Sequence, residues 1–313
     1  MQRAGVEWPS GSDMRRVELI TARRHPQERG RLRMVLDTDT FNEVDDQFAL
    51  AHVLLSGDRV DLEAVYAAPF YNEKSTGPGD GMSKSYEEIG LVLDRCGKTG
   101  IPVLEGAREW LGEGEPVTSS PATEDLIARA LAKDGDPLYV VAIGAPTNVS
   151  SALLAAPEIM DRIVIVWLGG NALWWPTARE FNLKQDLVAS RVLFDSGAAL
   201  VHVPCLGVAD HMITCGAEIE KYVRSAGRAG ALLADRFAEH VGDGIGVSKV
   251  IWDMVAVGWL LDSSWTTTVL VPSPLLTDEM TWSRDDGRHL IGEVTALQRD
   301  AIFSDFFTRL NES

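Results

Sequence analysis

The stretch VLDTDTFNEVDDQFAL, from Val35 to Leu50, places five acidic residues within ten positions, Asp37 to Asp46. An apolar run precedes these acids, and a segment with helical periodicity follows them. Like charges this close repel one another, so the pattern calls for a bound cation or a set of hydrogen-bond donors. A helix N-cap accounts for one or two acids but not for five, so the stretch predicts a functional site.

Apolar runs of the same kind recur along the chain and alternate with helix-like segments. The predicted strands are Arg33–Leu36, Leu62–Tyr66, Leu138–Ile143, Ile163–Trp167, Leu200–Val203 and Leu290–Ala296. The predicted helices are Asp46–Leu55, Ser83–Arg95, Thr123–Lys133, Asn148–Ala156, Asp186–Asp195, Glu218–Ser225, Val250–Leu261 and Asp300–Leu310. This alternation is typical of the α/β class, with a mostly parallel sheet covered by helices on both faces.

The domain organisation follows from composition. Residues 1–30 are rich in Arg, Gly, Ser and Pro, which predicts a poorly ordered N-terminal extension. No linker divides the remainder, so we expect residues 31–313 to form a single domain. In such a domain, ligands bind at the carboxyl ends of the strands. Asp37, Asn72, Gly144–Asn148 and Gly169–Asn171 all follow predicted strands, which indicates one shared crevice.

Charge and cysteine content exclude several classes. The formal net charge of −17 argues against nucleic acid and against anionic membranes as partners. The longest apolar run, Ile163–Leu168, is far too short to span a membrane. The three cysteines, Cys96, Cys205 and Cys215, contain no CxxC pair, which favours a reducing, cytoplasmic location.

The acidic residues have a defined placement within the expected fold. Asp37 and Asp39 alternate at a strand end, so they leave the backbone on the same side. Asp45 and Asp46 stand at a helix entry, where the helix dipole favours carboxylates. Carboxylates without nearby His or Cys suit a hard cation, Ca²⁺ or Mg²⁺, and the number of acids favours Ca²⁺. The spacing is not that of an EF-hand, so distant segments would complete the site.

The acidic segment resembles the N-terminal signature of the nucleoside hydrolases, whose pattern is D-x-D-x-x-x-D-D; this chain carries two additional residues before the second pair. Further segments match the family's pattern in order: FYNEKS (70–75), AIGAPTNV (142–149), REFNLKQD (179–186) and VIWDMVAV (250–257). The resemblance spans about residues 32 to 312. It implies a nucleoside-hydrolase-like α/β domain with its site at the carboxyl ends of the strands.

The resemblance also implies a metal centre and a reaction. One Ca²⁺ would be bound by Asp39, Asp46, Asp253 and the backbone carbonyl of Thr147. Asp39 would act as the general base on a water molecule. The reaction would be hydrolysis of the N-glycosidic bond of a ribonucleoside to ribose and a free base. Its transition state resembles an oxocarbenium ion, which dense negative charge stabilises.

Substrate contacts are implied in the same way. Asp45 would accept a hydrogen bond from a ribose hydroxyl, and Glu180 and Asn182 would bind the other hydroxyls. Asn72 and Asn42, the latter in the expanded loop, would assist. From the residues alone, a solvated loop is the favoured setting for Glu180 and Asn182, and the matching motif supports the binding role instead. An Asx-turn is the alternative for Asn72.

The leaving-group side departs from the family pattern. The inosine-uridine type has a His before its last metal-binding Asp, and here that residue is Trp252. A Trp stacks on a base but donates no ring proton as a general acid, which favours purine nucleosides; a core role for Trp252 is the alternative. Trp174 or Trp175 would cap the base pocket. His240, in a glycine-rich stretch, would be a candidate acid or a simple surface residue.

Two rival interpretations stay open at this stage. The DTDT segment is also similar to the D-x-D-x-[TV] opening of haloacid-dehalogenase-type phosphatases, in which Asp37 would be the nucleophile. Alternatively, the chain would be a catalytically inactive or sensing homologue that binds nucleoside or ribose. By its resemblance, the chain is expected to be a homodimer or homotetramer.

Overall fold

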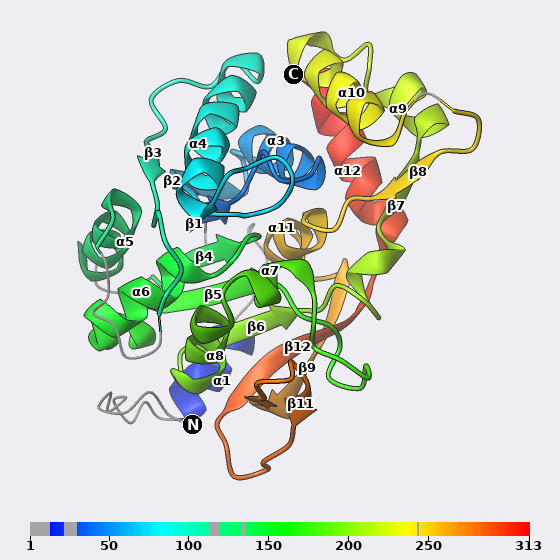
Figure 1. The fold of residues 1–313 in the computed structure, drawn as a ribbon. Coiled ribbons are helices and arrows are strands. Elements are labelled where there is room, and N and C mark those ends of the chain that lie inside the picture. Colours follow the sequence, from blue (N-terminus) through cyan, green and yellow to red (C-terminus); the bar gives the residue numbers. More distant parts are fainter. Residues whose placement is uncertain (1–12, 22–29, 113–118, 133–135, 243) are drawn as a thin grey trace.

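The computed structural model describes residues 13–21, 30–112, 119–132, 136–242 and 244–313. At its centre lies an eight-stranded sheet in which all strands are parallel except one edge strand, β9, which runs antiparallel to β12 (Figure 1). In sheet order the strands are β3 (Val103–Glu105), β2 (Val60–Ala67), β1 (Leu32–Thr38), β4 (Leu138–Ala142), β5 (Ile163–Leu168), β6 (Ala199–Val203), β12 (Leu290–Leu297) and β9 (Thr266–Pro272). The predicted α/β class is confirmed.

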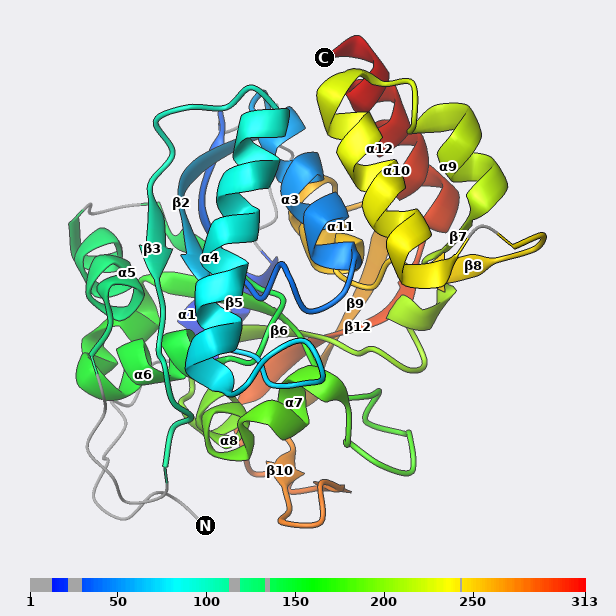
Figure 2. The same cartoon turned by 45° about the horizontal axis from the view of Figure 1, so that its top comes forward.

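Helices cover both faces of this sheet, as Figures 1 and 2 show. Strand β1 illustrates why: Met34 and Leu36 enter one hydrophobic core, and Val35 between them enters the other. The first core is built with α3 (Asp45–Leu55), α4 (Pro78–Arg95), α9 (Gly216–Tyr222), α10 (Gly227–Val241), α11 (Met254–Leu261) and α12 (Arg299–Glu312). The second is built with α5 (Pro121–Ala132), α6 (Thr147–Ala155), the 3₁₀ helix η1 (Pro157–Asp161) and α8 (Leu187–Asp195).

The N-terminal segment differs from its prediction over part of its length. Residues Asp13–Thr21 form helix α1, which packs against β6 and β12. Leu19 and Ile20 are buried in the first core, and the Arg16 guanidinium donates to the Gly197 carbonyl. Apolar burial therefore orders a segment that composition alone marked as an extension. The rest of the predicted extension, residues 1–12 and 22–29, lies outside the described part of the chain.

Two short antiparallel ribbons supplement the sheet: β7 (Ile213–Cys215) with β8 (Ser248–Val250), and β10 (Leu275–Leu276) with β11 (Trp282–Ser283). The first ribbon corrects a helix boundary. Val250 pairs with Ile213 in this ribbon, so the helix predicted from Val250 begins only at Met254.

The sheet register fixes where the site is built. Strand β1 lies between β2 and β4, where the strand order reverses, and ligands of open α/β sheets bind at such a point. Asp37 pairs with Ala142, and Thr38 pairs with Ala67. The chain therefore leaves β1, β2 and β4 at the same edge. Among the described residues, none of the helices is long and apolar enough to cross a membrane.

Candidate active site

A cavity of about 210 Å³ opens at the carboxyl ends of the central strands. Its lining comes from segments far apart in the sequence, which follow β1, β4, β5 and β6 or precede α11. The lining residues are Asp39, Asn42, Glu43, Asp45, Asp46, Ile143, Leu168, Asn171, Arg179, Glu180, Phe181, Asn182, Cys205, Leu206, Trp252 and Asp253. A crevice is therefore present at the strand ends, although Asn171 is the one lining residue among those from which it was predicted; six of the lining residues carry a carboxyl group.

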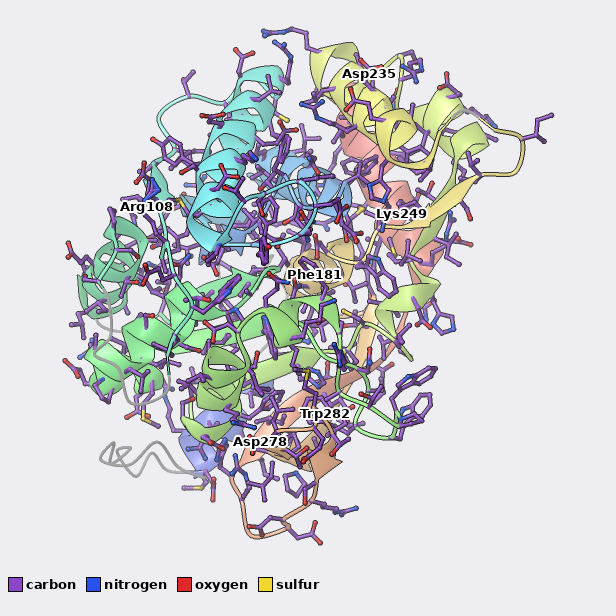
Figure 3. All side chains as sticks on the ribbon, in the orientation of Figure 1. Arg108, Phe181, Asp235, Lys249, Asp278 and Trp282 are labelled. Atoms are coloured by element: carbon purple, nitrogen blue, oxygen red, sulfur yellow. The ribbon has the colours of Figure 1, made fainter. Side chains whose placement is uncertain are left out.

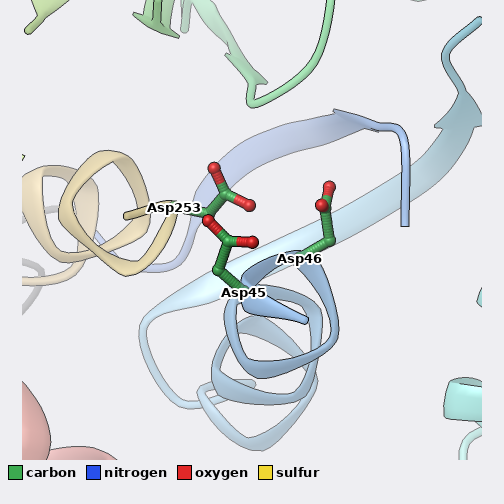
Figure 4. A group of neighbouring side chains, drawn as sticks. All are labelled: Asp45, Asp46 and Asp253. Carbon is green, nitrogen blue, oxygen red and sulfur yellow. The ribbon is translucent and has the colours of Figure 1, made fainter. Parts of the chain in front are cut away.

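Three of these carboxylates form a compact cluster. Asp45 and Asp46 lie in the first turn of α3, and Asp253 occupies the N-cap position of α11, the helix beside α3. One oxygen from each side chain lies within 4.8 Å of the others. Figure 4 shows the Asp45 and Asp253 carboxylates pointing toward one another. All three residues are buried, so each carboxylate has lost its hydration and lies beside other carboxylates.

Burial and repulsion act together on the titration of this cluster. Burial is the larger cause, and with the neighbouring acids it raises the pKa of Asp45 and Asp253 well above the usual range. The pKa of Asp46 rises to about 6 because of burial, although a hydrogen bond from the Thr38 hydroxyl opposes the shift. Ionising the cluster near neutral pH is therefore costly unless a cation compensates it.

Asp39 and Asp37 lie at the end of β1 beside this cluster. Both carboxylate oxygens of Asp39 are buried without a hydrogen-bond partner in the described part of the chain. Burial, and then repulsion from Asp46 and Asp45, raises the pKa of Asp39 well above its usual range. Asp37 is held differently, because one of its oxygens accepts a 2.7 Å hydrogen bond from the Asn148 side chain.

These observations test whether the residues fit a metal ion. Buried carboxylate oxygens without partners are rare, because each leaves a desolvated acceptor uncompensated. The donor set of the Asp45, Asp46 and Asp253 cluster is entirely oxygen, which is the preference of hard cations such as Ca²⁺ and Mg²⁺. The residues therefore fit a hard divalent cation. The predicted ligand Thr147 begins α6, where its hydroxyl donates to Asp186, and the role of its carbonyl stays a prediction.

The opposite wall is built around Glu180 and Asn182. Glu180 caps the short helix α7 (Phe181–Gln185), and its carboxylate accepts from the backbone N–H groups of Gly170, Asn182 and Leu183 at 2.8–3.2 Å. The Asn182 amide group donates to the carbonyls of Ile143 and Leu168, both at 3.0 Å. These contacts hold both side chains at the cavity wall, so the alternative of a solvated loop is wrong.

Asn42 and Trp252 also line the cavity, as predicted, whereas Asn72 does not. The Asn72 oxygen accepts from the Lys74 backbone N–H at 2.9 Å, which is the Asx-turn considered from sequence. Its amide donates to the Asn42 oxygen at 2.6 Å. Asn72 therefore supports a lining residue and is not one itself.

Three further candidates lie outside the cavity. Trp174 is 70% exposed and lines a separate hollow with Trp282 and Glu293, while Trp175 packs against it with ring centroids 5.2 Å apart. His240 sits in the last turn of α10 and not in a glycine-rich lid. It faces another cavity, with Lys74 and Arg236 in its lining. The prediction that these residues contact the base is not supported by their positions.

Several lining residues were not selected from sequence. Arg179 and Phe181 stand inside the REFN segment, and Cys205 follows β6; Asn171, after β5, was noted only as the end of the Gly169–Asn171 segment. Phe181 is labelled in Figure 3, at the start of α7. Their positions could have identified them, since each lies just after a strand or within a segment that matches the family pattern. Glu43 lies within the two-residue expansion and was counted only as part of the acidic run.

Comparison with known proteins gives this geometry a context. A family model described as inosine-uridine preferring nucleoside hydrolase matches residues 34–296. The pyrimidine-specific ribonucleoside hydrolase RihA of Enterobacter sp. (strain 638) is 27% identical over 268 residues, covering 76% of this chain and 82% of the relative. RihA of Escherichia coli O9:H4 (strain HS) is similar to the same degree over 269 residues.

Solved structures share the fold. The plant nucleoside hydrolase PpNRh1 superimposes with a TM-score of 0.72 at 18% identity, covering 90% of this chain and 99% of that one. The purine-preferring ribonucleoside hydrolase from Gardnerella vaginalis gives a TM-score of 0.71 at 23% identity, covering 90% and 98%.

The family match accounts for features that the phosphatase interpretation leaves unexplained. It spans the acidic run after β1, the Glu180–Asn182 wall and the Asp253 turn, which together enclose one cavity. The phosphatase interpretation explained only the first of these segments and is wrong. The chain belongs to the inosine-uridine preferring nucleoside hydrolase family, and is thus an enzyme that hydrolyses the N-glycosidic bond of ribonucleosides.

Proposed function

We propose that this enzyme is a Ca²⁺-dependent ribonucleoside hydrolase in which Asp39, Asp46, Asp253 and the Thr147 carbonyl bind the ion. The observation that carries the proposal is the group of buried carboxylates, with both Asp39 oxygens unpartnered among the described residues. Ca²⁺ suits this role because it accepts six to eight oxygen ligands in flexible geometry and can hold a sugar diol and a water together.

The side chains of the chain supply the remaining chemistry. Asp39 accepts the proton of the attacking water, because neither of its oxygens is engaged in a hydrogen bond among the described residues. Asp45 accepts a hydrogen bond from a ribose hydroxyl. Glu180 and Asn182 bind the other hydroxyls from the opposite wall. The surrounding carboxylates stabilise the positive charge that develops on the ribose ring.

For the base we propose a preference for purines, supported by the position of Trp252 in the cavity lining. The indole offers a stacking surface, and a purine presents the larger ring system to it. The names of the similar proteins include both a pyrimidine-specific and a purine-preferring enzyme, so the preference is a property to be measured.

The test is release of base and reducing sugar from a panel of nucleosides: inosine, adenosine, guanosine, uridine, cytidine and 2′-deoxyinosine. Each is assayed with EDTA and after readdition of Ca²⁺. We expect cleavage of purine ribosides that EDTA abolishes and Ca²⁺ restores, with 2′-deoxyinosine a poor substrate. Cleavage that resists EDTA would refute the metal requirement. Tight binding of nucleoside without release of any base would favour the alternative of a sensing homologue.

Cellular context completes the proposal. The three cysteines form no disulfide, in keeping with a reducing cytoplasm. The resemblance to the family supports a homodimer or homotetramer. Sedimentation velocity of the purified protein distinguishes these states from a monomer.

A further inference from the structure

The charges that line the cavity are strongly unequal. Among the described residues that line the cavity, six carry a carboxyl group and one, Arg179, carries a cation. Glu43, one of the six, is paired with Lys249 from outside the lining. Arginine side chains carry a fixed positive charge in proteins. An arginine surrounded by carboxylates is expected to form an ion pair with one of them, so an unpaired arginine in an acidic cavity calls for an explanation.

Arg179 is held in position by its backbone. Its N–H donates to the Thr177 hydroxyl at 3.1 Å, and its carbonyl accepts from the Asn171 side chain at 3.4 Å. The Thr177 hydroxyl in turn lies 3.1 Å from the Met280 carbonyl, to which it donates. Glu180, the next residue, caps α7. The main chain of Arg179 is therefore fixed on both sides at the cavity wall.

The guanidinium itself is unengaged. Within the described parts of the chain, no hydrogen bond or ion pair involves the Arg179 side chain, although other arginines are paired, such as Arg191 with Asp278 and Arg288 with Asp195. The adjacent Glu180 does not capture it, because three backbone N–H groups occupy that carboxylate. Arg179 is exposed, so its head is free to meet a ligand.

The reaction produces a negative charge that a cationic side chain could stabilise. When the C1′–N bond of a nucleoside breaks, both electrons of that bond remain with the base, which carries negative charge until solvent protonates it. Water forms the new bond to C1′ and passes its proton to Asp39. The carboxylates stabilise the positive charge that develops on the ribose, but they repel the negative charge on the departing base. Trp252 supplies at most an indole N–H, so it offers no positive charge.

We propose that Arg179 is a catalytic residue that stabilises the negative charge on the departing base. The inference rests on the proposed hydrolase function and adds the residue that acts on the leaving group. Arg179 donates N–H groups to the base without transferring a proton, since it does not deprotonate, and the base takes its proton from water. It thereby performs the task that the family's usual His would perform by protonation.

The test compares a poor leaving group with a good one. Inosine needs assistance at the base, whereas p-nitrophenyl β-D-ribofuranoside releases a stable anion without it. We expect Arg179→Ala to lower kcat on inosine by about 100- to 1000-fold, the loss typical of a removed charge-stabilising donor. The same variant should change kcat on the p-nitrophenyl riboside by less than about fivefold. Arg179→Lys should fall between these limits on inosine, because it keeps the charge and loses the fork geometry.

The control is Arg284→Ala, which removes another exposed arginine, one that pairs with Asp286 and lies outside the acidic cavity. It should leave both activities unchanged. Circular dichroism of each variant checks the fold.

Several outcomes would overturn the inference while leaving the hydrolase function intact. One is an equal loss on both substrates, and another is no loss on either. A loss confined to inosine 5′-monophosphate, assayed alongside, would place the guanidinium at the 5′ end of the ribose instead. Failure of the unmodified enzyme to hydrolyse any of these compounds would instead refute the proposed function and, with it, this inference.

Discussion

Replacing Asp37 with Asn isolates the energetic cost of one buried carboxylate in the quoted acidic stretch. Asp37 is fully buried; one oxygen accepts from Asn148, and the other has no partner within the described residues. Burial is the dominant cause that raises its pKa, to about 7, and the hydrogen bond from Asn148 opposes the rise. Asn has nearly the same shape as Asp but does not ionise, so the Asp37→Asn protein lacks the titratable group at this position and keeps the shape of the side chain.

The sign of the effect follows from linkage. The folded-state pKa of Asp37, about 7, exceeds the reference value of 3.8, so the folded protein binds this proton more tightly than the unfolded chain does. The contribution of Asp37 to stability is therefore fully present below about pH 4 and is lost as the pH rises through 7. At about 1.4 kcal/mol per pKa unit, ionisation of Asp37 lowers the free energy of unfolding by about 2 to 3 kcal/mol between pH 5 and pH 8.

The assay is urea denaturation of both proteins at pH 5 and pH 8 in EDTA, so that divalent cations do not mask the cost. The unmodified protein should lose about 2 to 3 kcal/mol more than Asp37→Asn across this range. Asp58→Asn is the control, because a hydrogen bond from Arg309 lowers the pKa of Asp58 and that variant should gain nothing at pH 8. Parallel pH profiles for the unmodified protein and Asp37→Asn would refute the reasoning.

Three further predictions address the site. Asp253→Asn should abolish the calorimetric signal of Ca²⁺ binding and lower kcat at least about 100-fold, because it removes one carboxylate of the cluster; retained Ca²⁺ affinity would contradict the assignment. Glu180→Gln should lower the free energy of unfolding by about 1 to 3 kcal/mol, measured in urea, since its amide faces N–H donors with an N–H group of its own; unchanged stability would show that the cap is dispensable. Trp174→Ala should change kcat/KM less than about threefold, because its side chain does not line the cavity; a tenfold loss in steady-state assays would mean that its loop closes over the substrate.

The central sheet could be predicted because its strands are nearly continuous apolar runs. Every residue of Ile163–Leu168 is buried, as expected of a parallel strand covered on both faces. Strand β9 was missed because TTTVLVP lies at the sheet edge, where three threonines and a terminal proline weaken the apolar signal. Strand β3 is only three residues long and offers no periodicity to detect.

Helix α10 was not predicted from the sequence because of its glycines. Leu233, Ala234 and Phe237 form a buried stripe, yet Gly227 and Gly230 interrupt the helical pattern at its start. The structure explains Gly230, because a Cβ atom there would lie 2.1 Å from the Val223 carbonyl oxygen. Close approach of the backbone therefore requires glycine where propensity argues against a helix.

The site residues also fall into two groups: those placed by local structure could be predicted from sequence, and those placed by tertiary contacts could not. The acids of the first motif are fixed by a strand end and a helix start, so spacing along the chain was enough to bring them together. Trp174 and His240 depend on the path of a loop and on a helix that was not foreseen. Trp174 lies against Gly207, a long-range contact that local sequence does not encode. Loop direction is set by such tertiary contacts, and adjacency to a motif is a poor guide to it.

Stability, cation binding and catalysis are coupled through the same carboxylates. Asp39, Asp46 and Asp253 are costly to ionise without a compensating cation, as their raised pKa values indicate. A bound cation removes that cost, so it stabilises the fold most at pH values where the metal-free protein is weakest. If the cation binds as proposed, protons compete with it for the same oxygens, so its affinity should fall as the pH drops through about 6, the pKa of Asp46. An acidic cavity that is unfavourable for folding alone is therefore favourable once it holds a cation and a developing ribosyl cation.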